Sequence, residues 1–366
     1  MKDSSDRMHV KLSTGLPALD RVFRGIMAGD NIVWQISSLD DYLPFVKPFA
    51  AYARLSRQKL IYFRFADHQP LLEEQDGAVL CQLHPDKGFE YFIEEEHRVI
   101  NETGRGGLYV FDCLSQLAPD WYSDRMLGNF FMLTCPYLYD RGAVVYFAIQ
   151  RNFHSFHAIR PISNTAQILS DIYRYKDQIY VHPLKVQYRH SPTMYMLHEW
   201  HGDEMRPVTQ SCIITDILSR MPWSRLDSAS SMLGFWTRTF AEAEDIQADL
   251  DRNLPTGEKA QEYHHKLLCM LIATTGRIHE LAEQYFTLRD LLEIRRRMIG
   301  TGQIGGKSVG MLLARAILRA EAPRCHGHLE AHDSFYVGAD VFYTYLVQNN
   351  CWWLIRKAKS TFSLDE

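Results

Sequence analysis

Residues 31–65 read NIVWQISSLDDYLPFVKPFAAYARLSRQKLIYFRF, and the pattern of this stretch is the clearest indication of the fold class. Two short runs rich in β-branched and aromatic residues, Asn31–Ser37 and Leu60–Phe65, flank the segment Tyr42–Leu55, in which apolar residues recur at helical spacing. A strand, a helix and a second strand in this order are typical of a βαβ unit in a parallel sheet. We therefore predict an α/β fold with a mainly parallel sheet and flanking helices.

The same alternation continues along the chain to about Val208. Further strands are predicted at Leu108–Asp112, Ala143–Ile149, Gln178–Gln187 and Thr193–Glu199, and further helices at Trp121–Tyr139 and Ala166–Arg174. The last two strands, joined around residues 189–192, indicate an antiparallel hairpin at a sheet edge.

Strand signals disappear after Pro207, and long amphipathic patterns take their place. Helices are predicted at Phe235–Leu250, Gly257–Ala273 and Ile278–Gly300. The basic run at 289–297 indicates a solvated helix face with an apolar stripe rather than a nucleic-acid patch. We therefore expect three parts: an α/β domain at 1–208, a helical connector at 209–298 and a third segment at 299–366.

Composition excludes several classes of protein. Hydrophobic residues make up 46% and charged residues 23% of the 366 residues, as in ordinary globular proteins. A formal net charge of -4 provides no basic field for nucleic acid. The longest apolar runs, such as 142–149 and 267–273, fall short of the roughly 18 residues that span a membrane. The seven cysteines are scattered without a C-x-x-C pair, and the N-terminus has no secretory signal, so we expect a cytoplasmic location.

The first domain resembles the RecA-like ATPases of the circadian-clock type. The segments that carry this resemblance are Leu12–Asp20 (LSTGLPALD), Ala28-Gly29-Asp30 ahead of the first strand, and Leu108–Asp112. The resemblance implies a nucleotide-binding fold in which Asp112 would help to hold magnesium in an active member. Without a phosphate loop, we expect Asp112 to cap a loop instead.

The phosphate loop of that family is missing from the turn after the first strand. An active member needs G-x-x-x-x-G-K-[ST] there, because glycine backbone donors and a lysine hold the phosphates. The chain has neither residue in Ser37–Pro44, which reads SSLDDYLP. At about 5 Å and an effective dielectric near 20, each contact of Asp40 or Asp41 with a phosphate charge costs about 3 kcal/mol. We predict that the domain binds no nucleoside triphosphate at this turn, and that Asp40 is the N-cap of the following helix.

The strongest local motif lies near the end of the chain, where residues 299–320 read IGTGQIGGKSVGMLLARAILRA. Glycines followed by a lysine and by the helix-forming run Leu312–Ala320 suit a loop where backbone donors, the helix dipole and an ammonium group converge on an anion. This stretch, together with DSFYVGADVFY at 333–343, resembles the start of the nucleotide-binding domain of phosphoenolpyruvate synthases and pyruvate phosphate dikinases. The resemblance implies the start of an ATP-grasp-type α+β domain that uses ATP and magnesium. It also implies that Lys307 contacts the phosphates and that Gly305 and Gly306 shape its loop.

The resemblance implies the N-terminal portion of an ATP-dependent phosphotransferase of the phosphoenolpyruvate synthase type. The remaining ATP-grasp part, the phosphohistidine domain and the barrel that binds phosphoenolpyruvate would follow residue 366 or lie on another chain. We expect no turnover from this portion alone, and association, as a homo-oligomer or with a complementary chain, through the apolar surface of an incomplete domain. The alternative is a non-catalytic regulatory or scaffolding module built on a RecA-like fold without its phosphate loop.

Other residues that could carry chemistry are given structural interpretations. The densest group of metal-ligand types, Cys325-His326-Gly327-His328 with His332-Asp333, lies between a predicted helix and strand, and metal binding is the less favoured interpretation. The pair His264-His265 is expected on a helix surface, and the aromatic residues of 193–200 are expected in the core. No catalytic nucleophile motif is present.

Overall fold

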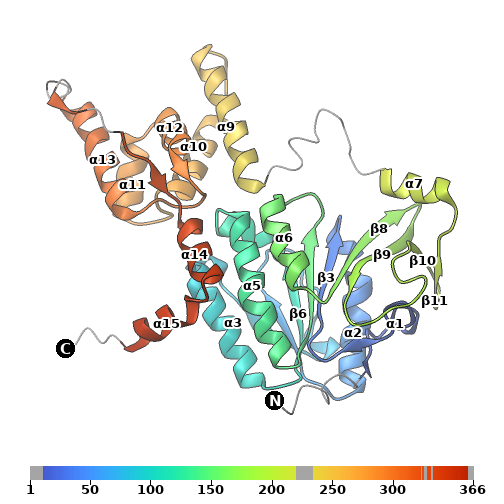
Figure 1. Ribbon diagram of the computed structural model, residues 1–366. Coiled ribbons are helices and arrows are strands. Elements are labelled where there is room, and N and C mark those ends of the chain that lie inside the picture. The colour runs from blue at the N-terminus through green and yellow to red at the C-terminus, as the bar shows by residue number, and fades with distance from the viewer. Residues whose placement is uncertain (1–10, 220–233, 323, 325–327, 331–332, 362–366) are drawn as a thin grey trace. The chain divides into compact units, whose positions relative to one another are not determined.

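The computed structural model describes residues 11–219, 234–322, 324, 328–330 and 333–361. The chain forms two compact units (Figure 1). The first comprises the described residues up to Trp121 and those from Leu127 to residue 219. The second comprises Tyr122–Met126 and the described residues from 234 onward.

Within the described residues, the first unit is built on a nine-stranded sheet with the order β11-β10-β9-β8-β3-β7-β6-β4-β5. The strands from β8 to β5 pair in parallel, whereas β9, β10 and β11 are antiparallel additions at one edge. The predicted α/β class with a mainly parallel sheet is therefore confirmed. The strands are β3 Asn31–Ile36, β4 Leu60–Arg64, β5 Ala78–Gln82, β6 Leu108–Cys113, β7 Val144–Gln150, β8 Ile168–Tyr175, β9 Gln178–Val186, β10 His198–His201 and β11 Glu204–Pro207.

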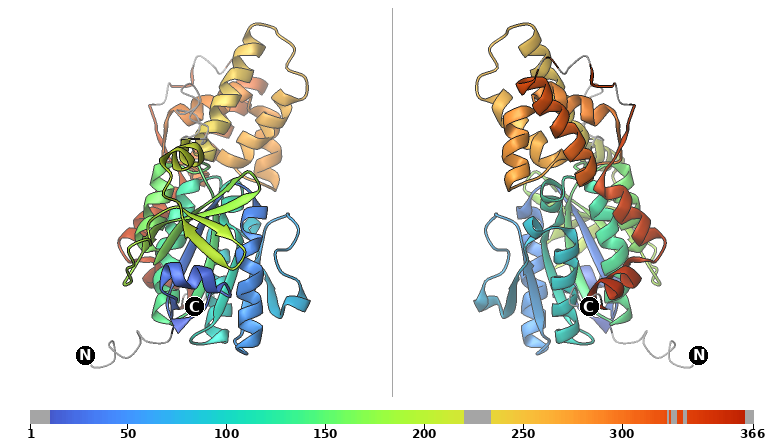
Figure 2. Two further views of the ribbon diagram at one scale, coloured as in Figure 1. Left: turned by 90° about the vertical axis from the view of Figure 1, so that its right-hand side faces the viewer. Right: turned by 90° about the vertical axis from the view of Figure 1, so that its left-hand side faces the viewer.

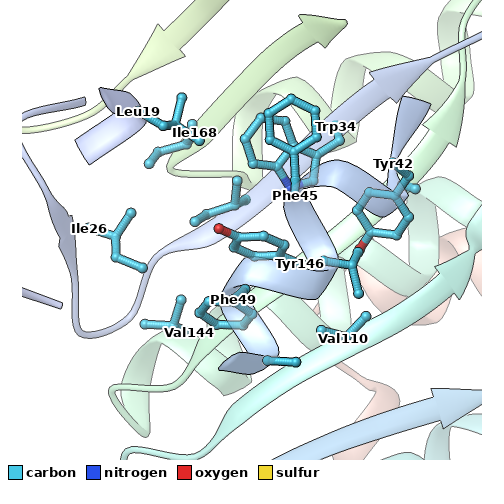
Figure 3. Packing of buried hydrophobic residues seen from close by; sticks show 14 of the residues in the cluster. Leu19, Ile26, Trp34, Tyr42, Phe45, Phe49, Val110, Val144, Tyr146 and Ile168 are labelled. Atoms are coloured by element: carbon cyan, nitrogen blue, oxygen red, sulfur yellow. The ribbon is translucent and has the colours of Figure 1, made fainter. Parts of the chain in front are cut away.

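Helix α2 (Leu43–Leu55) covers one face of this sheet (Figure 1). Its aromatic side chains pack on those of β3 and β7, as Figure 3 shows. The rings of Phe45 and Trp34 stack with centroids 4.5 Å apart, and those of Phe49 and Tyr146 stack at 4.1 Å. Truncating one such fully buried ring to alanine costs about 3–5 kcal/mol, so these contacts fix the position of the segment between β3 and α2.

Helices α3 (Phe89–Thr103) and α5 (Asp124–Asp140) lie on the opposite face (Figures 1 and 2). Phe130 of α5 contacts Phe111 of β6 and Phe147 of β7 with ring centroids 5.9 and 6.1 Å apart. Phe147 directly follows Tyr146, whose ring points to the α2 side, so consecutive residues of β7 fill two separate cores. The remaining helices of this unit are α1 Pro17–Phe23, α4 Leu117–Asp120, α6 Phe156–Thr165 and α7 Ser211–Ser219.

Two sequence-based predictions in this unit are wrong. The predicted helix Ala166–Arg174 is strand β8, which is buried on both faces between β3 and β9 and therefore has a continuous rather than an alternating apolar pattern. The predicted strand Thr193–Glu199 is mostly a turn, and only His198 and Glu199 belong to β10. The antiparallel pairing of β9 with β10 is confirmed, but β11 forms the edge. Strands β5 and β11 and helices α1, α3, α4, α6 and α7 were not predicted.

The second unit is mainly helical within the described residues, and Figure 2 shows α9 to α13 gathered in one bundle. Buried Trp236, Phe240, Leu268, Leu291 and Val309 join α9, α10, α12 and α13 in one core. Short strands β12 (Met298–Ile299) and β13 (Tyr336–Val337) pair in parallel. The helices are α9 Phe235–Asp251, α10 Lys259–Leu271, α11 Arg277–Tyr285, α12 Leu288–Arg296, α13 Gly306–Glu321, α14 Ala339–Gln348 and α15 Trp352–Thr361.

The predicted helix Ile278–Gly300 is instead two helices and a strand, α11, α12 and β12. The break lies at Thr287, which caps α12: its hydroxyl accepts the backbone N–H of Asp290 at 3.2 Å, and the Asp290 carboxylate accepts the backbone N–H of Thr287 at 2.9 Å. This reciprocal pair is a capping box, which starts a new helix inside a continuous amphipathic pattern. None of the helices in the described part of the chain is long and apolar enough to cross a membrane.

Candidate functional site

The turn after β3, where a RecA-like ATPase would hold phosphates, is occupied by the protein's own carboxylate. Residues Leu39–Asp41 form a short 3-10 helix, and Asp41, buried at 2% exposure, accepts the backbone N–H of Ser38 at 3.2 Å. The other oxygen of Asp41 pairs with Nε of Arg174 at 2.9 Å. Asp41 therefore takes both a backbone donor and a cation that an anionic ligand would need at this turn.

Asp40 is not the helix cap that the sequence predicts. It is exposed, and the N-cap position of α2 is occupied by Tyr42. The short 3-10 helix before α2 has Ser38 as its N-cap, with Asp41 as the capping carboxylate. The backbone carbonyl of Asp40, rather than its side chain, accepts a hydrogen bond from Arg174 at 3.2 Å. Two adjacent aspartates are equivalent in the sequence pattern, and only the packing decides which one turns inward.

Asp112 lies at the end of β6, where the pairing with β7 is irregular, and it is fully buried. One carboxylate oxygen accepts from Nη1 of Arg64 at 3.0 Å and from the backbone N–H groups of Phe65 and Ala66 at 2.9 Å each. The other accepts the hydroxyl proton of Tyr62. Asp112 thus closes the loop that follows β4, as expected for a loop cap, and its oxygens are engaged with protein donors rather than available to a metal ion.

Arg151 directly follows β7, and its side chain lies beside the end of β3. Its guanidinium donates to Ser37 Oγ at 3.3 Å and to the carbonyl of Gln35 at 3.2 Å. Its Nε lies 3.8 Å from a carboxylate oxygen of Asp171, and its charge lies 4.1 Å from the ring centre of Tyr173. Burial raises the pKa of Asp171, and Arg151 opposes that rise. The arginine therefore ties β3, β7 and β8 together.

A buried serine–histidine pair in the same unit has no sequence motif. Ser115 Oγ and His154 Nε2 are 2.7 Å apart, and the residues are 1% and 5% exposed. The same hydroxyl accepts the backbone N–H of Gln150 at 2.8 Å, so it also fixes the end of β7. A substrate cannot reach a hydroxyl buried to this degree, and the pair is therefore structural.

In the second unit, the predicted glycine-rich loop folds onto one buried aspartate, Asp340, the second residue of α14. Its carboxylate accepts the backbone N–H and the hydroxyl of Thr301 at 2.7 and 2.8 Å, and Nη1 of Arg125 lies 3.9 Å away. The hydroxyl of Ser123 contacts that of Thr301 at 2.6 Å. Asp340 therefore fixes the entrance of the loop. Sequence reasoning missed this role because 39 residues separate the partners.

The glycines of this loop fall into two kinds. Gly300 has φ +84°, and a Cβ added there would collide with the Asp340 carboxylate, so the fold itself requires glycine. Gly305 and Gly306 have negative φ, and a Cβ at either would meet no atom within 4 Å. Neither backbone strain nor packing inside the described residues explains why positions 305 and 306 are glycines.

Lys307 is the second residue of the 16-residue helix α13 and is exposed, as are Gly305 and Gly306. Gly305 is the N-cap and supplies no side-chain hydrogen bond to the first turn. Among the described residues, the ammonium group of Lys307 makes no hydrogen bond or ion pair. The predicted residues therefore combine uncapped backbone donors, the positive end of a helix and one unpaired cation.

The predicted ligand group at 325–333 lies largely outside the described residues, because Cys325, His326, Gly327 and His332 are not among them.

No protein-family model matches the chain, and no curated protein matches it.

Proposed function

We propose that this chain is the N-terminal portion of an ATP-dependent phosphotransferase of the phosphoenolpyruvate synthase type. In this proposal Gly305, Gly306 and Lys307 contact the phosphates of ATP bound with magnesium. The motif at 299–320 supports the assignment through its resemblance to that family. The start of α13 supports it through exposed backbone and through Lys307, whose ammonium group has no partner among the described residues.

One observation carries the proposal: nothing in the described part of the chain explains why residues 305 and 306 are glycines. Glycine is needed where a backbone adopts positive φ or where another group approaches it closely. Gly300 satisfies the first condition, but Gly305 and Gly306 have negative φ and open space around them. A phosphate group beside their backbone N–H groups supplies the second condition, because a methyl group at either position would shield those donors.

The first unit has a different role in this proposal. We propose a RecA-like frame without a nucleotide site, because Asp41 and Asp112 engage the backbone donors that follow β3 and β4. These contacts are the specific support for the second candidate function, a non-catalytic regulatory or scaffolding module. The two functions are compatible if the first unit regulates and the second binds nucleotide.

The described residues of the loop provide no set of free carboxylates to hold magnesium. They also provide no side chain that would accept a phosphoryl group. Asp340 is engaged with Thr301, and phosphoryl transfer requires metal ions and several positioned cations. We propose that a complementary part of the nucleotide-binding domain, on this or another chain, supplies them. Apolar side chains that such a part would cover are exposed on α14 and α15, with Phe342 at 50%, Tyr345 at 63% and Leu354 at 68% exposure.

Calorimetric titration of the chain with ATP and magnesium tests the nucleotide site. Lys307→Ala should weaken binding about 10- to 100-fold, because a charge-assisted hydrogen bond contributes about 1.5–3 kcal/mol. Lys259→Ala is the matched control, since Lys259 is also exposed at the start of a helix of the second unit. Equal binding by the wild type and Lys307→Ala would rule out the site, and absence of binding in both would favour the scaffolding function.

A further inference from the structure

Two histidines and a cysteine converge between α10 and α11 in the second unit. His265, Cys269 and His279 each offer one ligand atom, and these atoms all lie within 4.8 Å of one another. We propose that this His265–Cys269–His279 cluster binds a transition-metal ion, with Zn²⁺ preferred and water as the fourth ligand. The proposal does not depend on nucleotide binding.

The local sequence explains how the three side chains meet. His265 and Cys269 are four residues apart on α10, so they lie on the same face of that helix. His279 lies in the first turn of α11, and the intervening chain reverses at Gly276, which has φ +85°. The i, i+4 pair on one helix therefore faces the beginning of the next.

The spacing of the donor atoms suits a tetrahedral ion. Sγ of Cys269 lies 3.7 Å from Nε2 of His265. A zinc ion with Zn–S of about 2.3 Å and Zn–N of about 2.0–2.1 Å holds sulfur and nitrogen about 3.6 Å apart at the tetrahedral angle. The Cys269 and His265 donor atoms are therefore already at the separation that an ion requires, and the His279 donor atom lies within 4.8 Å of both.

Both histidines have a partner for the ring nitrogen that points away from the cluster. Nδ1 of His279 donates to the carbonyl oxygen of Ala273 at 2.9 Å, which leaves Nε2 with a lone pair for a metal. Nδ1 of His265 lies 3.5 Å from a carboxylate oxygen of Glu283, while its Nε2 faces Cys269. Metal-binding histidines are oriented in this way by carbonyl or carboxylate groups behind them. A simple S–H···N hydrogen bond between Cys269 and His265 requires neither His279 nor Glu283.

The ligand types and their burial define the class of ion. One thiolate and two imidazoles suit Zn²⁺ and related transition metals, whereas Mg²⁺ and Ca²⁺ prefer oxygen ligands. Cys269 and His279 are 9% and 8% exposed, but His265 is exposed. An ion would thus be anchored on the buried side and open to water on the other, which is the arrangement of three-ligand zinc sites.

The cluster is connected to the glycine-rich loop through the backbone of α10. The carbonyl of Cys269 accepts from Nε2 of Gln303 at 3.1 Å, and the carbonyl of Leu271 accepts the backbone N–H of Ile304 at 2.9 Å. Residues 303 and 304 immediately precede Gly305. A bound ion that fastens α10 to α11 should therefore also stabilise the position of this loop.

Titration of the reduced full chain with Co²⁺ tests the proposal, because Co²⁺ reports thiolate coordination and geometry by its absorption. We expect a thiolate-to-cobalt charge-transfer band and the visible bands of four-coordinate Co²⁺, complete at one equivalent and bleached by Zn²⁺. Cys269→Ser should abolish the charge-transfer band. His265→Ala, an exposed position that the fold does not need, should abolish the four-coordinate spectrum, and Glu283→Gln should weaken binding about 10- to 100-fold.

Two cysteine variants serve as controls. Cys212→Ser removes an exposed thiol of α7 in the first unit, and Cys325→Ser removes the thiol of the other candidate group. Both should keep the wild-type spectrum. A wild-type chain without the charge-transfer band, a band that survives in Cys269→Ser, or a band lost in Cys325→Ser would overturn the proposal. If Cys269→Ser fails to fold, an unchanged spectrum in His265→Ala would overturn it equally.

Discussion

The turn after β3 in the first unit and the start of α13 in the second are both places where a chain could hold phosphate groups. In the first, the carboxylate of Asp41 accepts the backbone N–H of Ser38 and pairs with Arg174. In the second, Gly305 leaves the first turn of α13 uncapped and Lys307 has no recorded partner among the described residues. The protein's own carboxylate therefore occupies the turn after β3, whereas no side chain caps the start of α13.

This difference shows that a binding position is lost when the protein's own charges satisfy its donors. Asp112, Asp41 and Arg151 each join two or three strands or loops of the first unit, so their charges stabilise the fold. Asp340 plays the equivalent part in the second unit, but it binds Thr301, and a Cβ at Gly305 or Gly306 would meet no described atom within 4 Å.

Asp112→Ala should cause the largest loss of stability. It leaves the charge of Arg64, whose side chain is 13% exposed, without its partner, and it removes the acceptor of two buried backbone N–H groups. Breaking a buried ion pair on one side costs about 3–5 kcal/mol. Chemical denaturation of the variant and the wild type measures this difference. A loss below about 1 kcal/mol would contradict a structural role for the contacts of Asp112.

Alanine substitutions in the glycine-rich loop should separate stability from binding. Gly300→Ala should destabilise the second unit by about 2 kcal/mol or more, because it combines a positive φ with a collision against Asp340. Gly306→Ala should leave stability unchanged or raise it by up to about 1 kcal/mol, since alanine favours a helix, yet it should weaken binding of ATP with magnesium. Thermal unfolding and calorimetry on both variants provide the comparison. A destabilised Gly306→Ala would mean that the fold, not a ligand, requires that glycine.

Glu96→Gln should stabilise the first unit at neutral pH. Glu96 is fully buried in α3, its Oε2 accepts the hydroxyl of Thr134 at 3.0 Å, and burial raises the pKa of its carboxyl well above the ordinary range. A raised folded-state pKa gives stability that is complete below about pH 4.5 and declines as pH rises through the folded pKa, by up to about 1.4 kcal/mol per pH unit. The advantage of the glutamine variant should therefore grow with pH.

Denaturation of both proteins from pH 5 to 8 measures that advantage. The neighbouring His97, whose pKa burial lowers to about 3, is present in both, so its own titration cancels. A variant whose advantage stays constant across this range would contradict a protonated, buried Glu96.

Asp40→Ala should have the smallest effect. Asp40 is exposed and is not the helix cap, so the free energy of unfolding should change by no more than about 0.5 kcal/mol. Loss of a true N-cap would cost about 1 kcal/mol. Denaturation distinguishes the two values, and a loss near the larger one would restore Asp40 as the cap.

Much of the parallel sheet could be predicted from the sequence because β3, β4, β6 and β7 are short, strongly apolar and separated by helical segments. Strand β8 could not, because Ile168, Leu169, Ile172 and Tyr173 fit helical spacing as well as a strand buried on both faces. Only pairing with β3 and β9 decides between them. Local periodicity also gives no account of β5, which forms an edge with exposed Val79.

The candidate site was predictable only where its residues are adjacent in sequence. Gly305, Gly306 and Lys307 form a local motif and lie together at the start of α13. The anchoring of Thr301 by Asp340 and the meeting of Cys269 with His279 depend on how helices pack, and no spacing rule fixes that. The i, i+4 spacing of His265 and Cys269 is a local signal of a shared helix face, but the group at 325–333 contains more residues of metal-ligand type.

Hydrogen–deuterium exchange of the full chain with and without ATP and magnesium compares the two positions in a single experiment. We expect slower exchange in a peptide covering residues 300–312 and no change in a peptide covering residues 36–43, because Asp41 already occupies the turn after β3, whereas the first turn of α13 has no side-chain cap. Protection of residues 36–43 with none at 300–312 would contradict the claim.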